Sequence, residues 1–206
     1  MNPVYFKTRY AGSAYSLSQL PPDAGIELAF AGRSNAGKSS AINVITQQRG
    51  LAKVSRTPGR TQMINHFLVD PGRFLVDLPG YGYAKVAHKI RHHWQHTLQQ
   101  YLSTRASLRG LILVMDIRHP LQELDWQMIE WCSNAQLGLH VLLTKTDKLS
   151  RNAADKVLCA TAQKLEESGI EASLQLFSAH DKTGLDDAHA LLDEWFGLKA
   201  ASQVNT

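Results

Sequence analysis

Short runs of apolar residues alternate along this chain with longer stretches in which apolar and polar positions are mixed. The apolar runs have the length of buried strands, and the mixed stretches have the length of helices. Continuous apolar runs are typical of strands that are covered on both faces. The pattern therefore predicts an α/β protein, with a mostly parallel sheet of about six strands and helices on both faces. We predict strands over 26–31, 66–70, 73–77, 110–116, 140–144 and 172–177, and helices over 38–46, 89–103, 121–132, 153–168 and 185–196.

The two ends of the chain lack this alternation. Residues 1–24 have weak periodicity and a Pro21-Pro22 break, so we predict an N-terminal arm that leads into the domain. Residues 25–198 then form one domain, which is a common size for a single α/β unit. We predict a flexible tail over 199–206.

Composition points to the cytoplasm. Residues 1–10 lack the apolar centre of a signal peptide, and no apolar run approaches the roughly 20 residues that span a membrane. The two cysteines, Cys132 and Cys159, form neither a disulfide framework nor a metal-binding spacing. We therefore expect a protein of the reducing cytoplasm, monomeric and without a membrane partner.

Charge is distributed unevenly along the chain. Residues 1–120 contain 15 Lys or Arg and 5 Asp or Glu, a formal charge of +10, whereas residues 121–206 contain 7 and 13, a charge of −6. This excess of basic residues in the first half of the sequence favours a surface that faces nucleic acid. A solvated basic surface without a partner is the alternative.

The strongest motif follows the first predicted strand. Residues 32–39, Gly-Arg-Ser-Asn-Ala-Gly-Lys-Ser, fit the pattern G-x-x-x-x-G-K-[ST] between an apolar strand and a helix. In such a phosphate-binding loop, or P-loop, backbone N–H groups and the helix N-terminus surround phosphate oxygens. Lys38 reaches the outer phosphates and the Ser39 hydroxyl is a Mg²⁺ ligand.

A second motif selects the base. Thr144-Lys145-Thr146-Asp147 follows a buried strand, and the Asp147 carboxylate can accept hydrogen bonds from guanine N1–H and N2–H. Adenine offers neither donor, so it would leave the carboxylate unpaired. After the next strand, a backbone N–H at Ser178 or Ala179 can donate to guanine O6. A helix N-terminal acid is the alternative interpretation of Asp147.

Two further segments predict a switch that depends on the γ-phosphate. Asp77-Leu78-Pro79-Gly80 fits D-x-x-G after a strand, so Asp77 holds Mg²⁺ through water and the Gly80 N–H senses the γ-phosphate. Between the two phosphate motifs, Thr57-Pro58-Gly59-Arg60-Thr61 supplies the remaining metal ligand, for which we favour Thr61 over Thr57. This loop becomes ordered only with γ-phosphate and Mg²⁺ together.

The predicted site is therefore as follows. Lys38, Thr61 and Gly80 are the expected catalytic residues, and Ser39, Thr61 and Asp77 (through water) hold the metal. The expected nucleotide-binding residues are Gly32, Arg33, Ser34, Asn35, Ala36, Gly37, Lys38, Ser39, Ser40, Gly59, Arg60, Thr61, Asp77, Leu78, Pro79, Gly80, Thr144, Lys145, Asp147, Ser178 and Ala179.

These motifs in this order resemble those of the translation-factor-related GTPases. Finer details resemble the EngB group of bacterial ribosome-assembly GTPases. They are Thr57-Pro58-Gly59-Arg60-Thr61-Gln62, Asp77-Leu78-Pro79-Gly80-Tyr81-Gly82-Tyr83 and Asp116-Ile117-Arg118-His119-Pro120. The resemblance covers about residues 20–197. It implies a Ras-like P-loop GTPase fold, Mg²⁺-dependent GTP hydrolysis, assembly of the large ribosomal subunit with ribosomal RNA as partner, and a requirement in normal cell division and septation.

Two site positions raise questions about catalysis. Tyr81 stands where many regulatory GTPases have a glutamine that orients the attacking water, so we expect slow intrinsic hydrolysis that a partner completes. Asn35 matches a position that helps to hold K⁺ beside the phosphates in related GTPases. A polar turn residue without K⁺ is the alternative that we favour.

Other conspicuous residues have plainer interpretations. We expect Asp116 to cap the next helix, with partner sensing by Arg118 and His119 as the alternative. His88, His92 and His96, with His93 beside them, predict a solvated or RNA-facing helix and no transition-metal site. The aromatic residues expected to pack in the core are Trp126, Trp131 and Trp195.

The leading functional prediction is a GTP-driven switch that binds ribosomal RNA while a large subunit matures. Its basic loops, 53–62 and 80–92, predict salt-sensitive binding. One alternative is a GTP-regulated scaffold for a division or septum protein. A metabolic P-loop kinase is a weaker alternative, because no acceptor site or lid is evident.

Overall fold

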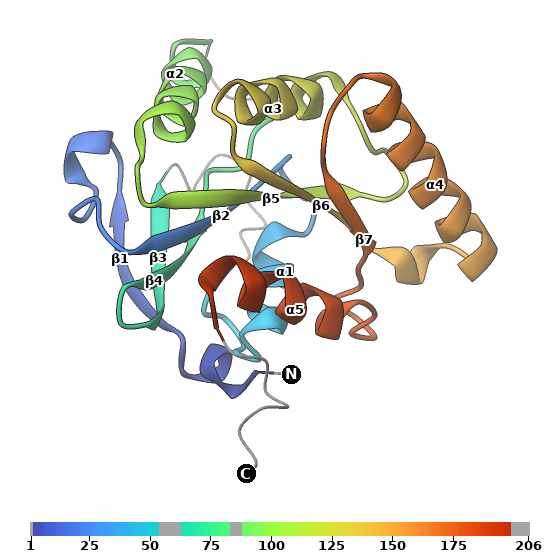
Figure 1. Cartoon of the computed structure of the whole chain (residues 1–206), viewed down its shortest axis with the longest axis horizontal. Coiled ribbons are helices and arrows are strands. Elements are labelled where there is room, and N and C mark those ends of the chain that lie inside the picture. The colour runs from blue at the N-terminus through green and yellow to red at the C-terminus, as the bar shows by residue number, and fades with distance from the viewer. Residues whose placement is uncertain (1, 54–62, 83–87, 199–206) are drawn as a thin grey trace.

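The computed structural model describes residues 2–53, 63–82 and 88–198, and only the backbone of residues 88–92 (Figure 1). The predicted alternation of strands and helices is confirmed. The strands are β1 (Arg9–Ala14), β2 (Ile26–Gly32), β3 (Ile64–Asp70), β4 (Arg73–Asp77), β5 (Leu108–Asp116), β6 (Gly138–Thr144) and β7 (Ser173–Leu176). The α-helices are α1 (Lys38–Ile45), α2 (His88–Thr104), α3 (Glu123–Asn134), α4 (Arg151–Glu167) and α5 (Leu185–Phe196). Short 3-10 helices are η1 (Pro3–Lys7), η2 (Leu17–Gln19) and η3 (Thr146–Lys148).

The described strands form one seven-stranded sheet in the order β1-β3-β4-β2-β5-β6-β7. Within the sheet, the neighbouring strands β4-β2-β5-β6-β7 are all parallel. Strand β3 runs antiparallel to both β1 and β4. The order reverses around β2, with β4 on one side and β5 on the other. In open parallel sheets, ligands bind beyond the strand ends at such a point.

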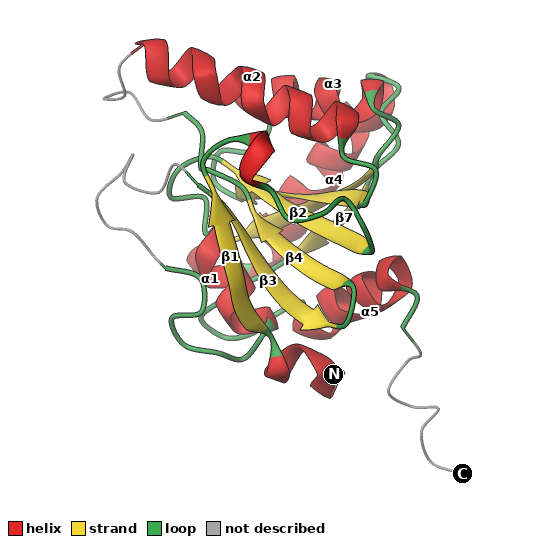
Figure 2. Cartoon of the chain, turned by 90° about the vertical axis from the view of Figure 1, so that its left-hand side faces the viewer, coloured by secondary structure: helices red, strands yellow, loops and turns green. Residues whose placement is uncertain are grey.

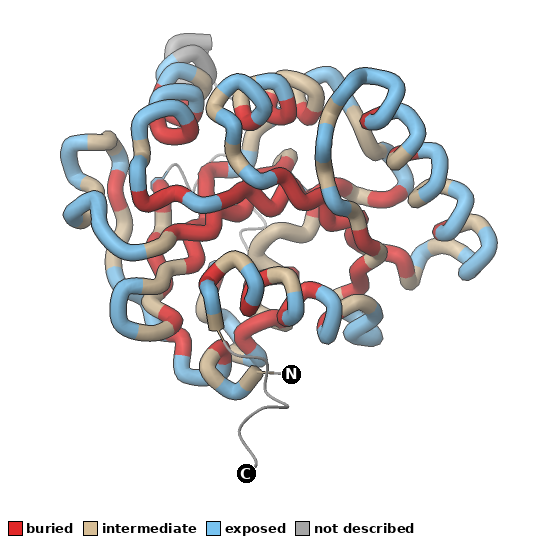
Figure 3. Tube along the Cα trace, in the orientation of Figure 1, coloured by how far each residue is buried: buried red, intermediate tan, exposed pale blue. Residues whose placement is uncertain are grey.

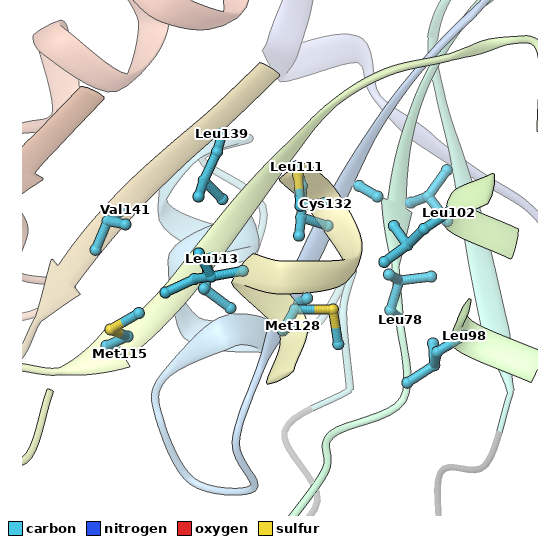
Figure 4. Close-up of a cluster of buried hydrophobic side chains, with 14 of the residues drawn as sticks. Leu78, Leu98, Leu102, Leu111, Leu113, Met115, Met128, Cys132, Leu139 and Val141 are labelled. Atoms are coloured by element: carbon cyan, nitrogen blue, oxygen red, sulfur yellow. The ribbon is translucent and has the colours of Figure 1, made fainter. Parts of the chain in front are cut away.

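Helices cover both faces of the sheet. Figures 1 and 2 show α2, α3 and α4 on one face and α1 and α5 on the other. Each face has its own hydrophobic cluster, and in Figure 3 the buried stretches follow the sheet and the inner sides of the helices. Figure 4 shows the larger cluster, in which Leu111 and Leu113 of β5 lie against Met128 and Cys132 of α3.

The N-terminal segment belongs to this sheet more closely than we predicted. Residues 1–24 were expected to be an arm, yet β1 pairs with β3 along its whole length and Tyr5 is fully buried beneath α5. The Tyr5 hydroxyl donates to Asp193 Oδ1 at 2.8 Å, which ties the N-terminus to α5. Strand β1 contains Gly, Ser and two Ala residues and has a bulge after Tyr10, so it has little of the β-branched content that marks a strand.

A buried ionic network holds the opposite end of β2. Glu27 is 1% exposed, and its carboxylate accepts hydrogen bonds from Tyr101 at 2.6 Å and Arg105 Nη2 at 2.5 Å. Burial alone would raise the pKa of Glu27, but the neighbouring His66 ring and the hydrogen bonds from Arg105 and Tyr101 outweigh it and lower that pKa to about 2. The network joins β2, β3 and α2 at the edge away from the phosphate motif.

None of the described helices is both long and apolar enough to cross a membrane.

Candidate nucleotide-binding site

The predicted site residues that the structure describes lie beyond the carboxyl ends of four parallel strands. The P-loop follows β2, the D-x-x-G segment follows β4, residues 144–147 end β6, and Ser178 and Ala179 follow β7. Because these ends share one edge of the sheet, motifs far apart in the sequence come together there. The expected Gly59, Arg60 and Thr61, with Thr57 as the alternative metal ligand, lie outside the described residues.

Packing against neighbouring strands forces the shape of the P-loop. A Cβ added to Gly32 would lie 2.5 Å from the Val114 carbonyl oxygen, so no larger residue fits between β2 and β5. Gly37 has a φ of 105°, and its added Cβ would meet Thr144 Oγ1 at 3.2 Å. Asn35 also has a positive φ of 66°, which Asn adopts more readily than most residues. This conformation favours the turn interpretation of Asn35, and K⁺ binding stays a prediction.

The base motif supports the P-loop directly. The Thr144 hydroxyl donates to the carbonyl oxygens of Ala36 and Met115. Lys145 Nζ donates to the Asn35 carbonyl oxygen at 2.6 Å and to Asp116 Oδ2 at 2.9 Å. Lys145 therefore joins three motifs, a role that the sequence analysis did not assign.

Asp116 corrects one expectation. It does not cap α3, since that helix begins at Glu123 with Gln122 as its N-cap residue. The Asp116 carboxylate instead accepts hydrogen bonds from Arg118 Nη2 at 2.6 Å and from Lys145 Nζ. Burial alone would raise the pKa of Asp116, but these bonds hold it well below its ordinary value. Asp116 therefore anchors Lys145. Its separation of several residues from the start of α3 is the sequence signal against a capping role.

Asp147 is oriented by two side chains. Its Oδ1 accepts a hydrogen bond from Ser178 Oγ at 2.9 Å, and its Oδ2 lies 3.0 Å from Lys148 Nζ. The hydrogen bond from Lys148, followed by that from Ser178, lowers the pKa of Asp147. The carboxylate is thus ionised and held in place at the end of β6, as acceptance of two hydrogen bonds from a base requires.

Ser178 has a different role from the one that we predicted. Its backbone N–H donates to the Thr183 carbonyl oxygen at 3.1 Å, so it already has a protein partner. Its buried hydroxyl orients Asp147. Between the two predicted donors to guanine O6, the structure favours the Ala179 N–H.

The phosphate lysine and the D-x-x-G aspartate are in contact. Lys38 Nζ forms a salt bridge with Asp77 Oδ1, and both side chains are largely buried. Asp77 ends β4 opposite Phe30 of β2, and Lys38 begins α1 immediately after the P-loop. The carboxylate of Asp77 and the hydroxyl of Ser39, next to Lys38, are the hard oxygen donors that Mg²⁺ prefers, so the residues present fit this metal.

Tyr81 is fixed at both its backbone and its side chain. Its carbonyl oxygen accepts from the Ser34 N–H at 2.8 Å, and its hydroxyl donates to Asp125 Oδ1 at 2.8 Å. Asp125 lies in the first turn of α3 and is a partner that the sequence analysis missed, because nothing in the local sequence pairs the two residues. Burial raises the pKa of Tyr81 well above its ordinary value, so the hydroxyl keeps its proton and remains a donor.

The histidine-rich helix is only partly described. His93 and His96 are exposed, whereas the side chains of His88 and His92 lie outside the described residues. Among the described side chains, no three His, Cys, Asp or Glu residues gather as a metal site. The tryptophans predicted to pack do so, since Trp126, Trp131 and Trp195 are partly buried against the two clusters.

Comparison with known sequences gives consistent matches. A family model described as "50S ribosome-binding GTPase" matches residues 27–145. A probable GTP-binding protein EngB of Nitrosococcus oceani is 56% identical over 198 residues, which cover 96% of this chain and 99% of that protein. One from Coxiella burnetii is 54% identical over 194 residues, covering 94% and 95% of the two chains.

Solved structures share the fold at low sequence identity. The crystal structure of a probable GTP-binding protein engB matches with a TM-score of 0.68 at 20% identity, covering 83% of this chain and 98% of that one. Era in complex with MgGDPNP and a 16S ribosomal RNA fragment matches with a TM-score of 0.65 at 17% identity, covering 89% and 60%. These matches confirm the predicted P-loop GTPase fold.

Proposed function

The chain belongs to the EngB family of GTP-binding proteins, and from this premise we propose that it is a Mg²⁺-dependent GTPase acting as a switch in large ribosomal subunit assembly. Through that role it is needed for normal cell division and septation. The observation that carries the nucleotide assignment is the placement of Asp147, held by Ser178 and Lys148 at the same sheet edge as the P-loop.

Guanine recognition follows from that placement. The Asp147 carboxylate accepts hydrogen bonds from N1–H and N2–H of the base, and the Ala179 N–H donates to O6. Lys145 stays bound to the Asn35 carbonyl oxygen, so its aliphatic stem offers an apolar surface for one face of the base. Adenine has neither the N1–H nor the N2–H donor, so it leaves the Asp147 carboxylate unpaired.

Phosphate binding uses the P-loop and the two flanking motifs. Backbone N–H groups of Asn35 and of residues 37–39 surround the phosphates at the N-terminus of α1. Lys38 leaves Asp77 and binds the outer phosphates. Ser39, Thr61 and Asp77 would hold Mg²⁺, which offsets charge on the phosphate oxygens. Thr61 and Gly80 then respond to the γ-phosphate as the two arms of the switch.

Slow intrinsic hydrolysis follows from Tyr81. The Tyr81 hydroxyl donates its single proton to Asp125, so it has no donor left to orient water together with an acceptor, as a glutamine amide does. We therefore propose that a partner supplies the missing group. Fast single-turnover hydrolysis by the purified protein alone would contradict this part of the proposal.

The partner side is best supported at α2 and the loop after β1. Helix α2 contains no Asp or Glu, and none occurs before Asp23 either. The Tyr15 ring, 43% exposed, stacks on His93 with ring centroids 5.6 Å apart. Exposed aromatic rings on an acid-free surface are typical of contact with single-stranded RNA. Figure 2 faces this side of the molecule.

Co-sedimentation tests the whole proposal. The protein is mixed at low salt with large-subunit particles in the presence of GDP or a non-hydrolysable GTP analogue. We expect association with the analogue, little with GDP, and loss of association as salt rises. Failure to associate in either nucleotide state would contradict the ribosomal role. A protein partner whose binding survives ribonuclease and high salt would favour the scaffold instead.

A further inference from the structure

The end of the D-x-x-G segment and the residues that follow it lie directly on the P-loop. The Ser34 N–H donates to the Tyr81 carbonyl oxygen at 2.8 Å, and the Tyr81 N–H donates to the Gly32 carbonyl oxygen at 3.3 Å, which makes a parallel β-bridge. Gly80 is equally close, because an added Cβ would lie 3.4 Å from Ser34 Cα. Residues 80–82 and 32–34 are therefore in van der Waals contact.

A side-chain anchor holds this contact from the far side. The Tyr81 hydroxyl donates to Asp125 Oδ1 at 2.8 Å, while Asp125 Oδ2 accepts from the Gln122 N–H at 3.0 Å. Asp125 is 1% exposed, and Tyr81 packs against the larger hydrophobic cluster. The carboxylate is thus fixed by the first turn of α3, and Tyr81 is fixed by the carboxylate.

The γ-phosphate of GTP has to enter where this contact lies. A phosphate that touches both the Gly80 N–H and the start of the P-loop must separate Gly80 from Ser34, which breaks the β-bridge. It must also take Lys38 from Asp77. GDP ends at the β-phosphate, deeper in the P-loop, and leaves the contact intact.

We propose that Tyr81 and Asp125 are specificity-determining residues that give the site a preference for GDP over GTP, because their hydrogen bond holds residues 80–82 against the P-loop. The proposal rests on the guanine-nucleotide binding proposed above. It assigns Asp125, which lies outside every nucleotide motif, a role in discriminating the number of phosphates. It also gives the site a threshold, since only ligands that form strong γ-phosphate contacts open it.

The decisive variant is Tyr81→Phe, which removes one hydroxyl and keeps the ring. Dissociation constants for GDP and a non-hydrolysable GTP analogue are measured with Mg²⁺ by competition against a fluorescent nucleotide. We expect the affinity ratio to shift about tenfold toward the GTP analogue, equivalent to roughly 1.4 kcal/mol, with GDP affinity changed less than twofold. This shift lies near the lower end of the net value of a hydrogen bond to a charged group.

Tyr5→Phe is the matched control, because the Tyr5 hydroxyl is also buried and donates to an aspartate at 2.8 Å. It removes the same kind of bond far from the P-loop, so the nucleotide ratio should stay unchanged. A second variant, Asp125→Asn, keeps the size of the side chain but removes its charge and one acceptor oxygen, and it should shift the ratio in the same direction by a smaller factor.

The outcomes separate this proposal from the function on which it rests. If Tyr81→Phe and Asp125→Asn both bind GDP normally, and the ratio of GDP affinity to GTP-analogue affinity stays within twofold of the original, the anchor does not set the preference. Equal weakening for both nucleotides would show a purely structural role and would also overturn it. If the unaltered protein does not bind GDP at all, the proposed nucleotide function itself fails.

Discussion

At the scale of single residues, the structure gives each site carboxylate its own cationic partner. Asp77 is paired with Lys38, Asp116 with Lys145 and Arg118, and Asp147 with Lys148. The pKa values of Asp116 and Asp147 are lowered by these contacts, so both groups stay ionised well below neutral pH. Asp116 is used inside the site to hold Lys145, whereas Asp147 is the carboxylate that we propose for the base.

Replacing Asp147 by asparagine should change the base that is bound. The amide cannot accept from both guanine donors, so GDP affinity should fall by about 100-fold, on the order of 2–3 kcal/mol for a bond to a charged group. Xanthine carries a carbonyl where guanine carries its amino group, so the amide introduced by Asp147→Asn can donate to it and XDP should then bind better than GDP. Competition binding of the two nucleotides measures the change, with Asp155→Asn on the exposed face of α4 as control. A variant that loses both nucleotides equally would indicate a structural role for Asp147.

A buried histidine predicts how stability depends on pH. His140 of β6 is 4% exposed and is hydrogen-bonded to Ser173 Oγ at 2.8 Å and Gln175 Oε1 at 3.1 Å. Burial lowers the pKa of His140 to about 4, below the ordinary value of about 6.5. The unfolded chain therefore binds a proton before the folded one does, and stability is lost as pH falls from about 6.5 toward 4.

Urea unfolding at pH 7 and pH 5 tests this expectation. His140 should account for roughly 2 kcal/mol of the stability lost between the two values. His140→Gln should reduce the pH dependence by that amount, whereas the exposed His119→Gln should leave it unchanged. Equal pH dependence in the two variants would mean that His140 is not protonated on unfolding in this range.

At the scale of elements, α5 places one large ring over two glycines of the sheet. Trp195 covers Gly110 of β5 and Gly138 of β6, where added Cβ atoms would lie 2.5 Å and 3.3 Å from the indole. The helix has well-marked ends, with Gly184 before it and Gly197 after it. Its predicted bounds, 185–196, agree with the structure for that reason.

Gly110→Ala should therefore destabilise the protein by about 1–3 kcal/mol, the usual cost of overpacking a core. Thermal or urea unfolding measures the loss. Combining Gly110→Ala with Trp195→Leu should recover part of the loss, and a double variant whose losses simply add would contradict the contact.

The elements also show where sequence prediction ends. Continuous apolar runs such as 110–116 identify buried strands. The motifs that follow these strands identify most of the residues of the site. Strand β1 was missed because its pairing with β3 comes from position rather than from composition. The roles of Asp116, Asp125 and Lys145 were missed because each depends on a partner from another motif, and a single sequence does not reveal such long-range pairs.

At the scale of the whole molecule, the basic and acidic halves of the sequence form different sets of strands and helices. The basic half supplies β1 to β5 with α1 and α2, and the acidic half supplies α3 to α5 with β6 and β7. The nucleotide site lies where both halves meet, since the P-loop and D-x-x-G segment come from the first and Asp147 from the second. The RNA surface proposed at α2 is entirely within the first half, so nucleotide binding and RNA binding should be separable by mutation.

A charge placed on α2 tests that separation. His96 is exposed on this acid-free helix, and His96→Glu adds a negative charge that RNA phosphates would repel. One such charge costs on the order of 1 kcal/mol at contact distance in water, so association with large-subunit particles should fall roughly fivefold at low salt. The difference should shrink as salt rises, because screening removes the repulsion.

Ala160→Glu, an exposed position on α4 in the acidic half, adds the same charge and should leave association unchanged. GDP affinity should be unaltered in both variants. Since their net charges are equal, any difference between them locates the RNA surface on α2, and equal association would place it elsewhere.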